Sequence, residues 1–496
     1  MKKALTLLLA VIMISGILAG CGSNNETSGT NKTVKCIYLV PGDEPTDLAI
    51  VQGLINDKMA ADGVGVELEF KYVPWDAWDQ KINIALSTNE KFDMFHVMND
   101  RVSLASYASR GALADITEAV NQYGENIKKY NPDIMMKAGQ VGEKQYGIPA
   151  YWVEFSINPQ ITIRKDIMRE YGITEMPTTF EELTAAYEKV MKEWKGAQKP
   201  YVMLIGSTMS GLNLTAKTYD AWPFVNYEKM INVSQDGTIK NYFETEEFKQ
   251  DCYNARTWYE KGLINPDVLV FTNDQLNAQL NSGDWFIHLG TYGNSIESIK
   301  KNYPDITVDD FGFIDLAPEK PNVRPYGTRN MQAIPLSSEH PEAGVKVVNW
   351  IYANQDNYDL FLYGREGVDF KKVEPRNRED IIDPAKNLPL YNFADWMIGS
   401  VEYLRPAIGS PTITNELLFN KDKTAVDGIC AQFTFDAKNV QTQMADVQTQ
   451  ISAVIAPIAS GIKDYDSNIE EALSLLKKAG VDDIIKEFKT QFEASK

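Results

Sequence analysis

Hydrophobic and polar positions divide the N-terminal part of the chain into a regular series of elements. Residues 34–40 contain the apolar run 36–40 and are predicted to form a strand, and residues 66–72 alternate apolar with charged side chains, which predicts a strand with one solvated face. Residues 46–60 and 75–87 carry apolar side chains at helical spacing, and residues 92–98 are a third candidate strand. The order strand, helix, strand, helix, strand predicts a mostly parallel sheet flanked by helices.

Periodic segments continue through the rest of the chain. Residues 177–183 (PTTFEEL) have the pattern of a helix start, with a capping threonine and an acidic first turn. Helical spacing also marks residues 245–261 and 341–353, and an apolar run at 333–335 predicts a short strand. Residues 469–492 form an amphipathic helical stretch at the C-terminal end.

The first residues have the pattern of a lipoprotein signal peptide. Lys2 and Lys3 precede an apolar run that ends in the motif Leu-Ala-Gly-Cys, with the cysteine at position 21. We expect residues 1–20 to be cleaved, Cys21 to carry lipid, and residues 21–33 to form a flexible tether with a reach on the order of 20 Å.

This interpretation places the protein on the outer face of a cell membrane. An ordinary secretory signal and a transmembrane helix are the alternatives, but the run is short for a span and no stop-transfer charges follow it. A diacylated cysteine carries two acyl chains, which suffice for stable anchoring. The expected location is the extracellular or periplasmic face of the membrane.

Composition restricts the partners of the remaining chain. The 496 residues are 44% hydrophobic and 24% charged, which is typical of a soluble globular protein with two large lobes or a few domains. The formal net charge of −19 opposes binding to nucleic acid and to anionic lipid. We therefore expect no nucleic-acid partner and a monomer that depends on its lipid for attachment.

Cysteine and histidine are too sparse for several kinds of site. Besides Cys21 the chain has Cys36, Cys252 and Cys430, and no pair of cysteines has metal-ligand spacing. Cys36 and Cys430 stand beside apolar residues, so we predict that both are small core residues. The three histidines are isolated in the sequence, which argues against a zinc site and a histidine-based triad. No cofactor or metal is expected.

Several short motifs occur in a characteristic order. They are 92–95 (FDMF), 99–101 (NDR), 111–117 (GALADIT), 142–149 (GEKQYGIP), 177–183 (PTTFEEL), 340–343 (HPEA) and 363–368 (YGREGV). Together they resemble family 1 extracellular solute-binding lipoproteins of ABC importers, which are similar to maltose-binding proteins. The motif at 363–368 is similar to a long Gram-positive subgroup. Asn99 departs from the family's histidine and Val97 from its tryptophan, and these departures concern the ligand more than the fold.

The resemblance implies an α/β fold of the periplasmic-binding-protein type, with two α/β lobes joined by a multi-strand hinge. Ligand would be held in the cleft between the lobes, and hinge closure would give a membrane permease a shape to recognise. Hinge crossings are expected near 150–154 and 313–317. The expected parts are 34–150 (lobe 1), 151–312 (lobe 2), 313–370 (hinge and lobe 1), 371–450 (lobe 2) and 451–496 (C-terminal helices).

Candidate ligand residues combine flat aromatic faces with groups that bind hydroxyls, as a sugar requires. The aromatic candidates are Trp75, Trp78, Tyr151, Trp152, Trp222, Tyr292 and Trp396. The polar candidates are Asp43, Asp100, Arg101 and Glu154. Asp43 follows the first strand, where open α/β sheets bind ligands. The resemblance implies ligand contact for Asp100, Arg101, Glu154 and Tyr292.

Each candidate also has a plain structural interpretation. Aromatic residues at helical spacing, such as Trp75 and Trp78, are more often core residues than ligand platforms. Neighbouring Asp100 and Arg101 could form only a surface ion pair, and Glu154 could cap a turn.

Two classes of function remain open at this level. Sequence motifs of serine hydrolases, zinc proteases and phosphate-binding loops are absent from the chain. The favoured function is a non-catalytic binding lipoprotein that delivers a carbohydrate, of oligosaccharide length, to an ABC permease. The alternatives are a receptor for a peptide or polyamine, a surface carbohydrate-active enzyme, and a sensor lipoprotein.

Overall fold

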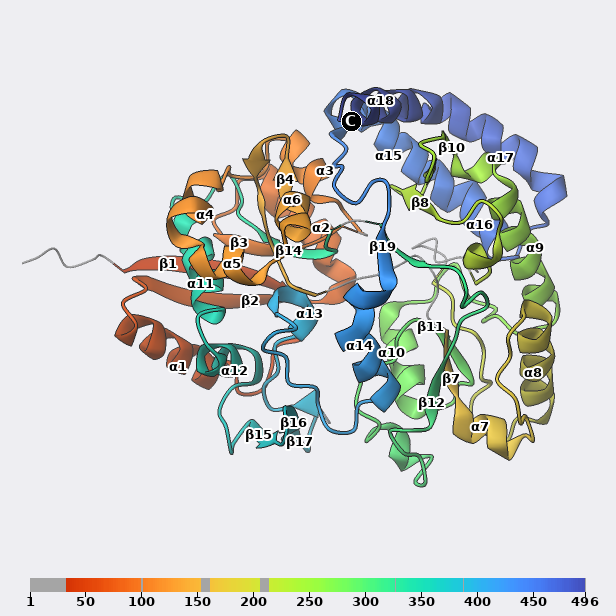
Figure 1. Cartoon of the computed structure of the whole chain (residues 1–496), viewed down its shortest axis with the longest axis horizontal. Helices are drawn as coiled ribbons and strands as arrows, with labels where there is room; N and C mark the ends of the chain where they lie inside the picture. The colour runs from red at the N-terminus through yellow and green to blue at the C-terminus, as the bar shows by residue number, and fades with distance from the viewer. Residues whose placement is uncertain are drawn as a thin grey trace, which may run out of the picture. The chain divides into compact units, whose positions relative to one another are not determined.

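A computed structural model describes most of the chain after the N-terminal segment. The described residues are 33–99, 101–152, 161–205, 214–325, 327–386 and 388–495, without the side chains of 421–424. Within these ranges, no helix combines the length and the apolar character that a membrane crossing requires. Residues Val34–Lys496 form one unit by their contacts, and Figure 1 shows its elements.

A five-stranded sheet forms from the predicted strand–helix series. Its strand order is β2-β1-β3-β14-β6, in which β1 pairs parallel with β2 and β3 while β14 pairs antiparallel with β3 and β6. The strands are β1 (Val34–Pro41), β2 (Val66–Val73), β3 (Met94–Met98), β6 (Gly147–Pro149) and β14 (Asn330–Ala333). The parallel order predicted for the first three strands is confirmed.

Amphipathic helices cover this sheet. Helix α1 (Leu48–Ala61) buries Leu48, Val51, Ile55 and Met59, the residues at helical spacing. Helix α2 (Trp78–Ser87) follows the 3₁₀ turn η1 (Trp75–Ala77) and buries Trp78. Because a helical face repeats about every 3.6 residues, these side chains meet the sheet together. The arrangement places η1 and the start of α2 just after the carboxyl end of β2.

Further segments complete the first lobe. They are α3 (Leu104–Ser109), α4 (Thr117–Tyr123), α5 (Glu125–Tyr130), α6 (Asp133–Ala138), β4 (Gln140–Val141), β5 (Lys144–Gln145), α11 (Pro341–Ile351), α12 (Gln355–Tyr363) and α13 (Asp395–Ile398). Helix α11 buries Val345, Val348 and Ile351, as its spacing predicts.

The expected assignment of residues 371–450 to the second lobe differs from the packing. Tyr391, Phe393 and Met397 belong to the same apolar core as Tyr38 of the first sheet. The rings of Phe393 and Tyr38 are stacked with centroids 5.9 Å apart. The chain therefore stays with the first lobe well beyond position 371, because these aromatic side chains complete its core.

A second sheet has the order β11-β7-β12, with both outer strands antiparallel to β7. Its elements are β7 (Ile161–Arg164), α7 (Lys165–Glu170), α8 (Phe180–Glu193), α9 (Glu246–Glu260), α10 (Asn273–Ser282), β11 (Ile287–Leu289) and β12 (Phe311–Ile314). The predicted cap is confirmed, because Thr179 Oγ1 accepts a hydrogen bond from the backbone N–H of Glu182.

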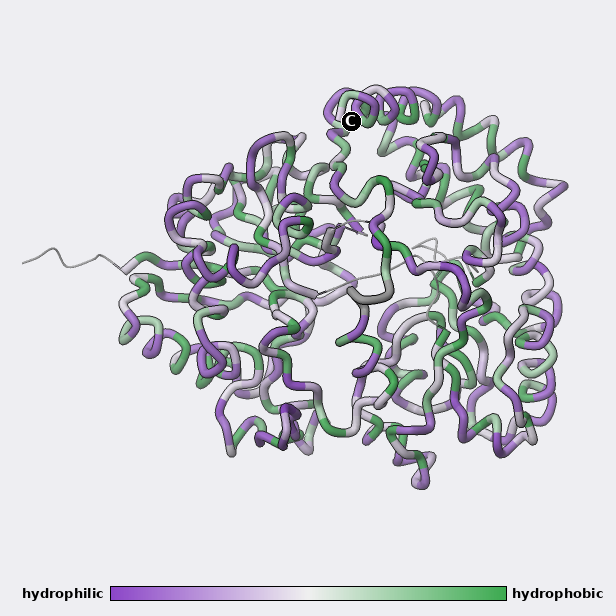
Figure 2. The backbone as a smooth tube through the Cα atoms, viewed as in Figure 1, coloured by the Kyte–Doolittle hydropathy of each residue, from purple (hydrophilic) through white to green (hydrophobic). Residues whose placement is uncertain are grey.

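A third sheet, β10-β9-β8, packs with the C-terminal helices. Figure 1 shows these helices beside β8 and β10, and Figure 2 shows hydrophobic and polar positions alternating along them. The elements are β8 (Phe224–Tyr227), β9 (Ile231–Ser234), β10 (Ile239–Asn241), η6 (Ala437–Val440), α15 (Gln441–Gln450), the π-helical η7 (Ile451–Ile455), α16 (Ala456–Ala459), α17 (Tyr465–Ala479) and α18 (Val481–Ala494).

The amphipathic stretch predicted at 469–492 lies on two helices, in agreement with the C-terminal helices expected at 451–496. Helix α17 ends at Ala479, and α18 begins at Val481. Gly480 between them has φ +101°, in the left-handed region that favours glycine. The sequence period continues across this position, so periodicity alone could not place the break.

The remaining elements are short. They are η3 (Ala216–Thr218), η4 (Tyr242–Glu244), η5 (Ile299–Lys301), β13 (Asn322–Arg324), β15 (Phe370–Val373), β16 (Asn377–Asp380), β17 (Ile382–Asp383), β18 (Leu388–Pro389), α14 (Thr412–Thr424) and β19 (Ala425–Asp427). β13 and β19 form a parallel pair.

Connections between the first and second sheets lie partly where the sequence places them. The first leaves β6 near Ala150, and residues 153–160 lie outside the described residues. The expected second crossing at 313–317 falls elsewhere, because Phe313 pairs with Thr162 inside the second sheet. The chain rejoins the first sheet only at Asn330, where β14 begins.

One buried carboxyl gives the second lobe a pH-dependent stability. Asp251 is buried, and desolvation raises its pKa to about 7 even though the hydroxyls of Tyr219, Tyr242 and Thr215 donate hydrogen bonds to it. A carboxyl with a folded pKa above its unfolded value binds more protons in the folded state, so its contribution to stability falls as pH rises between the two pKa values.

We therefore expect Asp251→Asn to raise the melting temperature more at about pH 8 than at about pH 5, because the amide keeps acceptor and donor groups without a charge. Thermal melts at both pH values measure the difference. Asp446→Asn, at an exposed position of α15, is the matched control and should show no such pH dependence. An equal change in melting temperature at both pH values for Asp251→Asn would contradict the raised pKa of Asp251.

Candidate functional site

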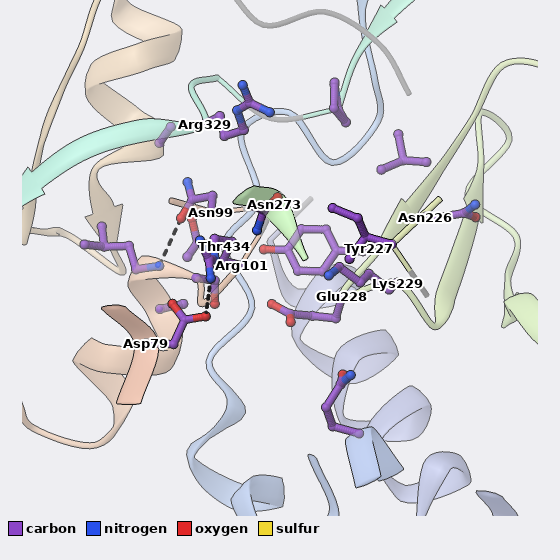
Figure 3. A pocket seen from close by; sticks show the side chains of 18 of the residues that line it. Asp79, Asn99, Arg101, Asn226, Tyr227, Glu228, Lys229, Asn273, Arg329 and Thr434 are labelled. Atoms are coloured by element: carbon purple, nitrogen blue, oxygen red, sulfur yellow. Dashed lines mark hydrogen bonds and ion pairs between the residues drawn. The ribbon is translucent and has the colours of Figure 1, made fainter. Parts of the chain in front are cut away.

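A cavity of about 880 Å³, shown in Figure 3, collects polar side chains from segments that are far apart in the chain. Its size falls in the range of small-molecule sites, about 300–1,000 Å³. The polar and charged residues that line it are Asp76, Asp79, Asn99, Arg101, Ser103, Asn226, Tyr227, Glu228, Lys229, Thr272, Asn273, Arg329, Thr434 and Gln448.

The first wall stands at the carboxyl ends of β2 and β3. Asp79 lies in the first turn of α2, and Arg101 lies in the turn between β3 and α3. Arg101 Nη2 donates to Asp79 Oδ2 over 2.8 Å, so each side chain orients the other. Figure 3 shows this pair together with Asn99 on one side of the cavity.

Asn99 fixes the shape of that wall. Its Oδ1 accepts from the backbone N–H of Leu104 at 3.0 Å, and its Nδ2 donates to the backbone carbonyl of Thr328 at 3.1 Å. The backbone N–H of Asn99 also donates to the carbonyl of Arg329 at 2.8 Å. Asn99 thus joins the start of α3 to the segment before β14, which positions Arg101 and Arg329 at the cavity.

An aromatic stack supports the same wall. The guanidinium of Arg101 lies 5.9 Å from the ring centroid of Trp75, and the rings of Trp75 and Trp396 are stacked with centroids 5.8 Å apart. Trp396 in turn meets His96 edge to face at 5.5 Å. Burial lowers the pKa of His96 to about 3, so this end of the stack is neutral near pH 7.

The opposite wall is the turn of the β8–β9 hairpin. Tyr227, Glu228 and Lys229 line the cavity there, as Figure 3 shows. Glu228 has φ +48° and Lys229 has φ +62°, which is uncommon for residues with a side chain. Burial raises the pKa of Glu228, while a hydrogen bond from Ser103 and the charge of Lys229 oppose that shift. Glu228 therefore links the second wall to the first.

The loop before α10 forms the rim. Thr272 and Gln275 make a reciprocal capping box at the start of the helix. Val270 lines the cavity and is 76% exposed, which leaves an apolar side chain at the mouth. Burial raises the pKa of Asp274, and the like charge of Asp76, more than that of Asp43, adds to this shift. The charge of Asp43 therefore acts on Asp274, next to the lining residue Asn273.

The charges of the described lining cancel. Three carboxylates and three basic groups line the cavity, so a strongly charged ligand gains little from their sum. They are Asp76, Asp79 and Glu228 for the acidic set and Arg101, Lys229 and Arg329 for the basic set.

The structure brings together only some of the residues predicted from the sequence. Arg101 lines the cavity, the stacked rings of Trp75 and Trp396 support it, and Asp43 is not among the lining residues. Tyr151 is half-buried, and its backbone forms an isolated parallel β-bridge with that of Ser400. Trp152 is half-buried beside the end of a described range. The predicted residues that lie outside the described residues are Cys21, Asp100 and Glu154.

Three predicted aromatic residues are packed in apolar cores. Trp78 is 2% exposed, Trp222 is 7% exposed and Tyr292 is 2% exposed. Tyr292 stacks on Phe311 with ring centroids 5.4 Å apart, and Trp222 Nε1 donates to the carbonyl of Pro321 at 2.8 Å. Their surroundings are those of core residues, which is the alternative that the sequence analysis gives for Trp78.

Sequence reasoning missed the second wall entirely. The polar run from Asn226 to Lys229 stands between two apolar runs, which could have indicated a hairpin turn. Nothing in that local pattern indicates which cavity the turn would face. Cys36 and Cys430 are buried, as predicted. Among the described residues, no group of three or more His, Cys, Asp or Glu side chains is placed to hold a metal ion.

Comparisons with known proteins find similar sequences over nearly the whole chain. A family model described as bacterial extracellular solute-binding protein matches residues 42–358, and a model described as a domain of unknown function (DUF3502) matches residues 429–496. A carbohydrate ABC transporter substrate-binding protein of Streptococcus pneumoniae serotype 4 is 24% identical over 98% of this chain and 96% of its own length. Lipoprotein LipO of Bacillus subtilis (strain 168) is 22% identical over 100% of this chain and 99% of its own.

A solved structure is similar over nearly the whole described fold. It is the N-glycan transport solute binding protein NgtS from Streptococcus pneumoniae in complex with Man1GlcNAc, with a TM-score of 0.73 and 18% identity. The match covers 93% of this chain and 99% of that chain. The fold class expected from the sequence is thereby confirmed.

Proposed function

This chain belongs to the family of bacterial extracellular solute-binding proteins, and on that premise we propose that its cavity captures an oligosaccharide for an ABC importer. The observation that carries the proposal is the lining, in which amides, hydroxyls and balanced charges stand beside aromatic rings. A sugar offers hydroxyls to the polar groups and apolar C–H faces to the rings. The named substrates of similar proteins, a carbohydrate and Man1GlcNAc, support the same class.

Charge balance favours a neutral saccharide over the alternatives. A polyamine receptor would need an excess of carboxylates, whereas the described lining has as many basic groups as acidic ones. A peptide remains the second candidate, because backbone amides also suit this polar lining. We propose binding without catalysis, in keeping with the family, so the bound saccharide should be recovered intact.

Attachment and movement complete the proposal. We propose that lipid on Cys21 holds the protein at the outer face of the membrane, which the similarity to lipoprotein LipO supports. We also propose that two lobes close over the cavity about the segments near Ala150 and Asn330, where the chain leaves and rejoins the first sheet.

The first test is a binding screen with the whole mature chain. Thermal shift and calorimetry against mannosyl-N-acetylglucosamine, maltotriose and kestose, with spermidine and a tripeptide as non-sugar probes, should show binding to at least one saccharide. Binding of only the tripeptide or only spermidine would refute the carbohydrate assignment and leave the receptor assignment. Chromatography of the recovered ligand should show no cleavage.

Asp79→Asn should weaken saccharide binding about tenfold, because the amide loses the charged hydrogen bond that orients Arg101. Calorimetry measures the loss, and thermal melts should show little change because the ion pair is partly exposed. Asp57→Asn, at an exposed position of α1, is the matched control and should bind as the wild type does. Equal affinities for the two variants would remove Asp79 and Arg101 from the site.

A further inference from the structure

The C-terminal region that matches a domain of unknown function, residues 429–496, reaches the cavity directly. Ala431, Phe433 and Thr434 line it from the segment before η6, and Gln448 lines it from α15. Figure 3 labels Thr434 among the side chains that line the cavity. We infer that this region is a wall of the saccharide site that helps to select the ligand, an inference that rests on the proposed function.

The wall segment is held in place by α18. Asp436 exchanges two backbone hydrogen bonds with the side chain of Gln491, with the Asp436 N–H donating at 2.9 Å and its carbonyl accepting at 2.8 Å. The ring of Phe433 packs edge to face on Phe488 at 5.1 Å and on Phe492 at 5.2 Å. Because α18 fixes both ends of this short segment, Thr434 between them is presented in a defined position.

The same segment positions an aromatic residue of the opposite wall. The hydroxyl of Tyr227 accepts from the backbone N–H of Phe435 at 3.2 Å and lies 3.5 Å from the carbonyl of Phe433, to which it donates. The Tyr227 ring also packs on Phe488 with centroids 5.1 Å apart. The C-terminal region therefore contributes its own side chains to the cavity and orients the hairpin turn that carries Glu228.

The wall also touches the first lobe. Lys137 of α6 donates to Gln432 Oε1 at 3.0 Å, and α3 packs against η6. Helix α3 begins next to Ser103, which lines the cavity and bonds Glu228. A region that contacts both sides of the cavity and places polar side chains in its lining can bind the ligand directly. A region that only extended the apolar core would have no polar side chain in the lining.

Thr434 and Gln448 are the residues to change, because Thr434→Val keeps the shape of the side chain and Gln448→Ala keeps a good helix former. Each change removes hydrogen-bonding groups from the cavity lining. We expect each variant to bind the best saccharide of the panel about three- to tenfold more weakly than the wild type. The ratio of affinities between two saccharides should change as well, because a shorter or differently branched ligand meets this wall differently.

Matched controls exist in the same region. Thr490→Val changes a threonine on the exposed face of α18 whose hydroxyl bonds the carbonyl of Lys486, and Gln441→Ala changes an exposed glutamine of α15. Both controls should keep wild-type affinities and affinity ratios in calorimetry against the same panel. Thermal melts on all four variants identify any that fail to fold.

The outcomes separate the two proposals. If the wild type binds a saccharide but Thr434→Val and Gln448→Ala match their controls, the C-terminal wall is refuted and the proposed function stands. If the wild type binds none of the saccharides, the proposed function fails and this inference fails with it. A changed affinity ratio in the two wall variants alone supports the inference.

Discussion

Replacing Cys21 with alanine should release the protein completely from the membrane fraction. The motif before this position provides small residues for cleavage, and the thiol is the only group there that can accept the lipid. Two acyl chains bind a bilayer stably, whereas the acidic remainder of the chain, with a formal net charge of −19 for the whole sequence, is repelled by anionic lipid. Detergent partition and labelling with a radioactive fatty acid measure the loss.

The matched control makes the same chemical change at a buried cysteine. Cys252→Ala, inside α9, should leave lipid labelling and membrane retention as they are in the wild type. Membrane retention of Cys21→Ala equal to that of Cys252→Ala would show that the attachment has another cause.

Replacing Tyr292 with alanine should lower the free energy of unfolding by about 3–5 kcal/mol, the usual cost of removing a large aromatic side chain from a core. Tyr292 is 2% exposed, stacks on Phe311 and packs beside Trp285 at 5.4 Å. Denaturant unfolding measures the loss. The fraction that stays folded should bind saccharide with normal affinity, because Tyr292 lies in the core.

Trp396→Ala is the informative comparison. Trp396 is half-buried and stacks on Trp75, which lies beneath the guanidinium of Arg101. We expect a smaller loss of stability than for Tyr292→Ala together with weaker saccharide binding, because Arg101 loses its support. A stable Tyr292→Ala variant with weakened binding would reverse these roles and restore Tyr292 as a ligand platform.

The sequence predicts the first lobe well because its signals are local. The alternation in β2 and the helical spacing of Val51, Ile55 and Met59 each require only neighbouring residues to interpret. The cap at Thr179 is equally local, since its partner is three residues away. The resemblance to a known family then predicted the overall fold class, which the hydrophobic periodicity of single elements could not indicate.

The site was harder to predict because it depends on distant contacts. Tyr227 and Phe435 are far apart in the sequence but share a hydrogen bond, and Gln491 of α18 holds the neighbouring Asp436 in place. Aromatic content near expected loops selected Trp222 and Tyr292, but both rings are buried by residues elsewhere in the chain. The boundary at 371 failed for the same reason, because Phe393 packs on Tyr38 across the fold.

The two left-handed residues at the hairpin turn, Glu228 and Lys229, imply a conflict between the stability of the fold and ligand binding. An L-residue in that backbone region costs roughly 1–2 kcal/mol, a cost that glycine at Glu228 or Lys229 would avoid. Glycine would also delete a charged side chain from the cavity lining. Selection for thermal stability alone would therefore favour glycine at these two positions and would lower the affinity for the ligand. A thermostable redesign should leave this turn unchanged.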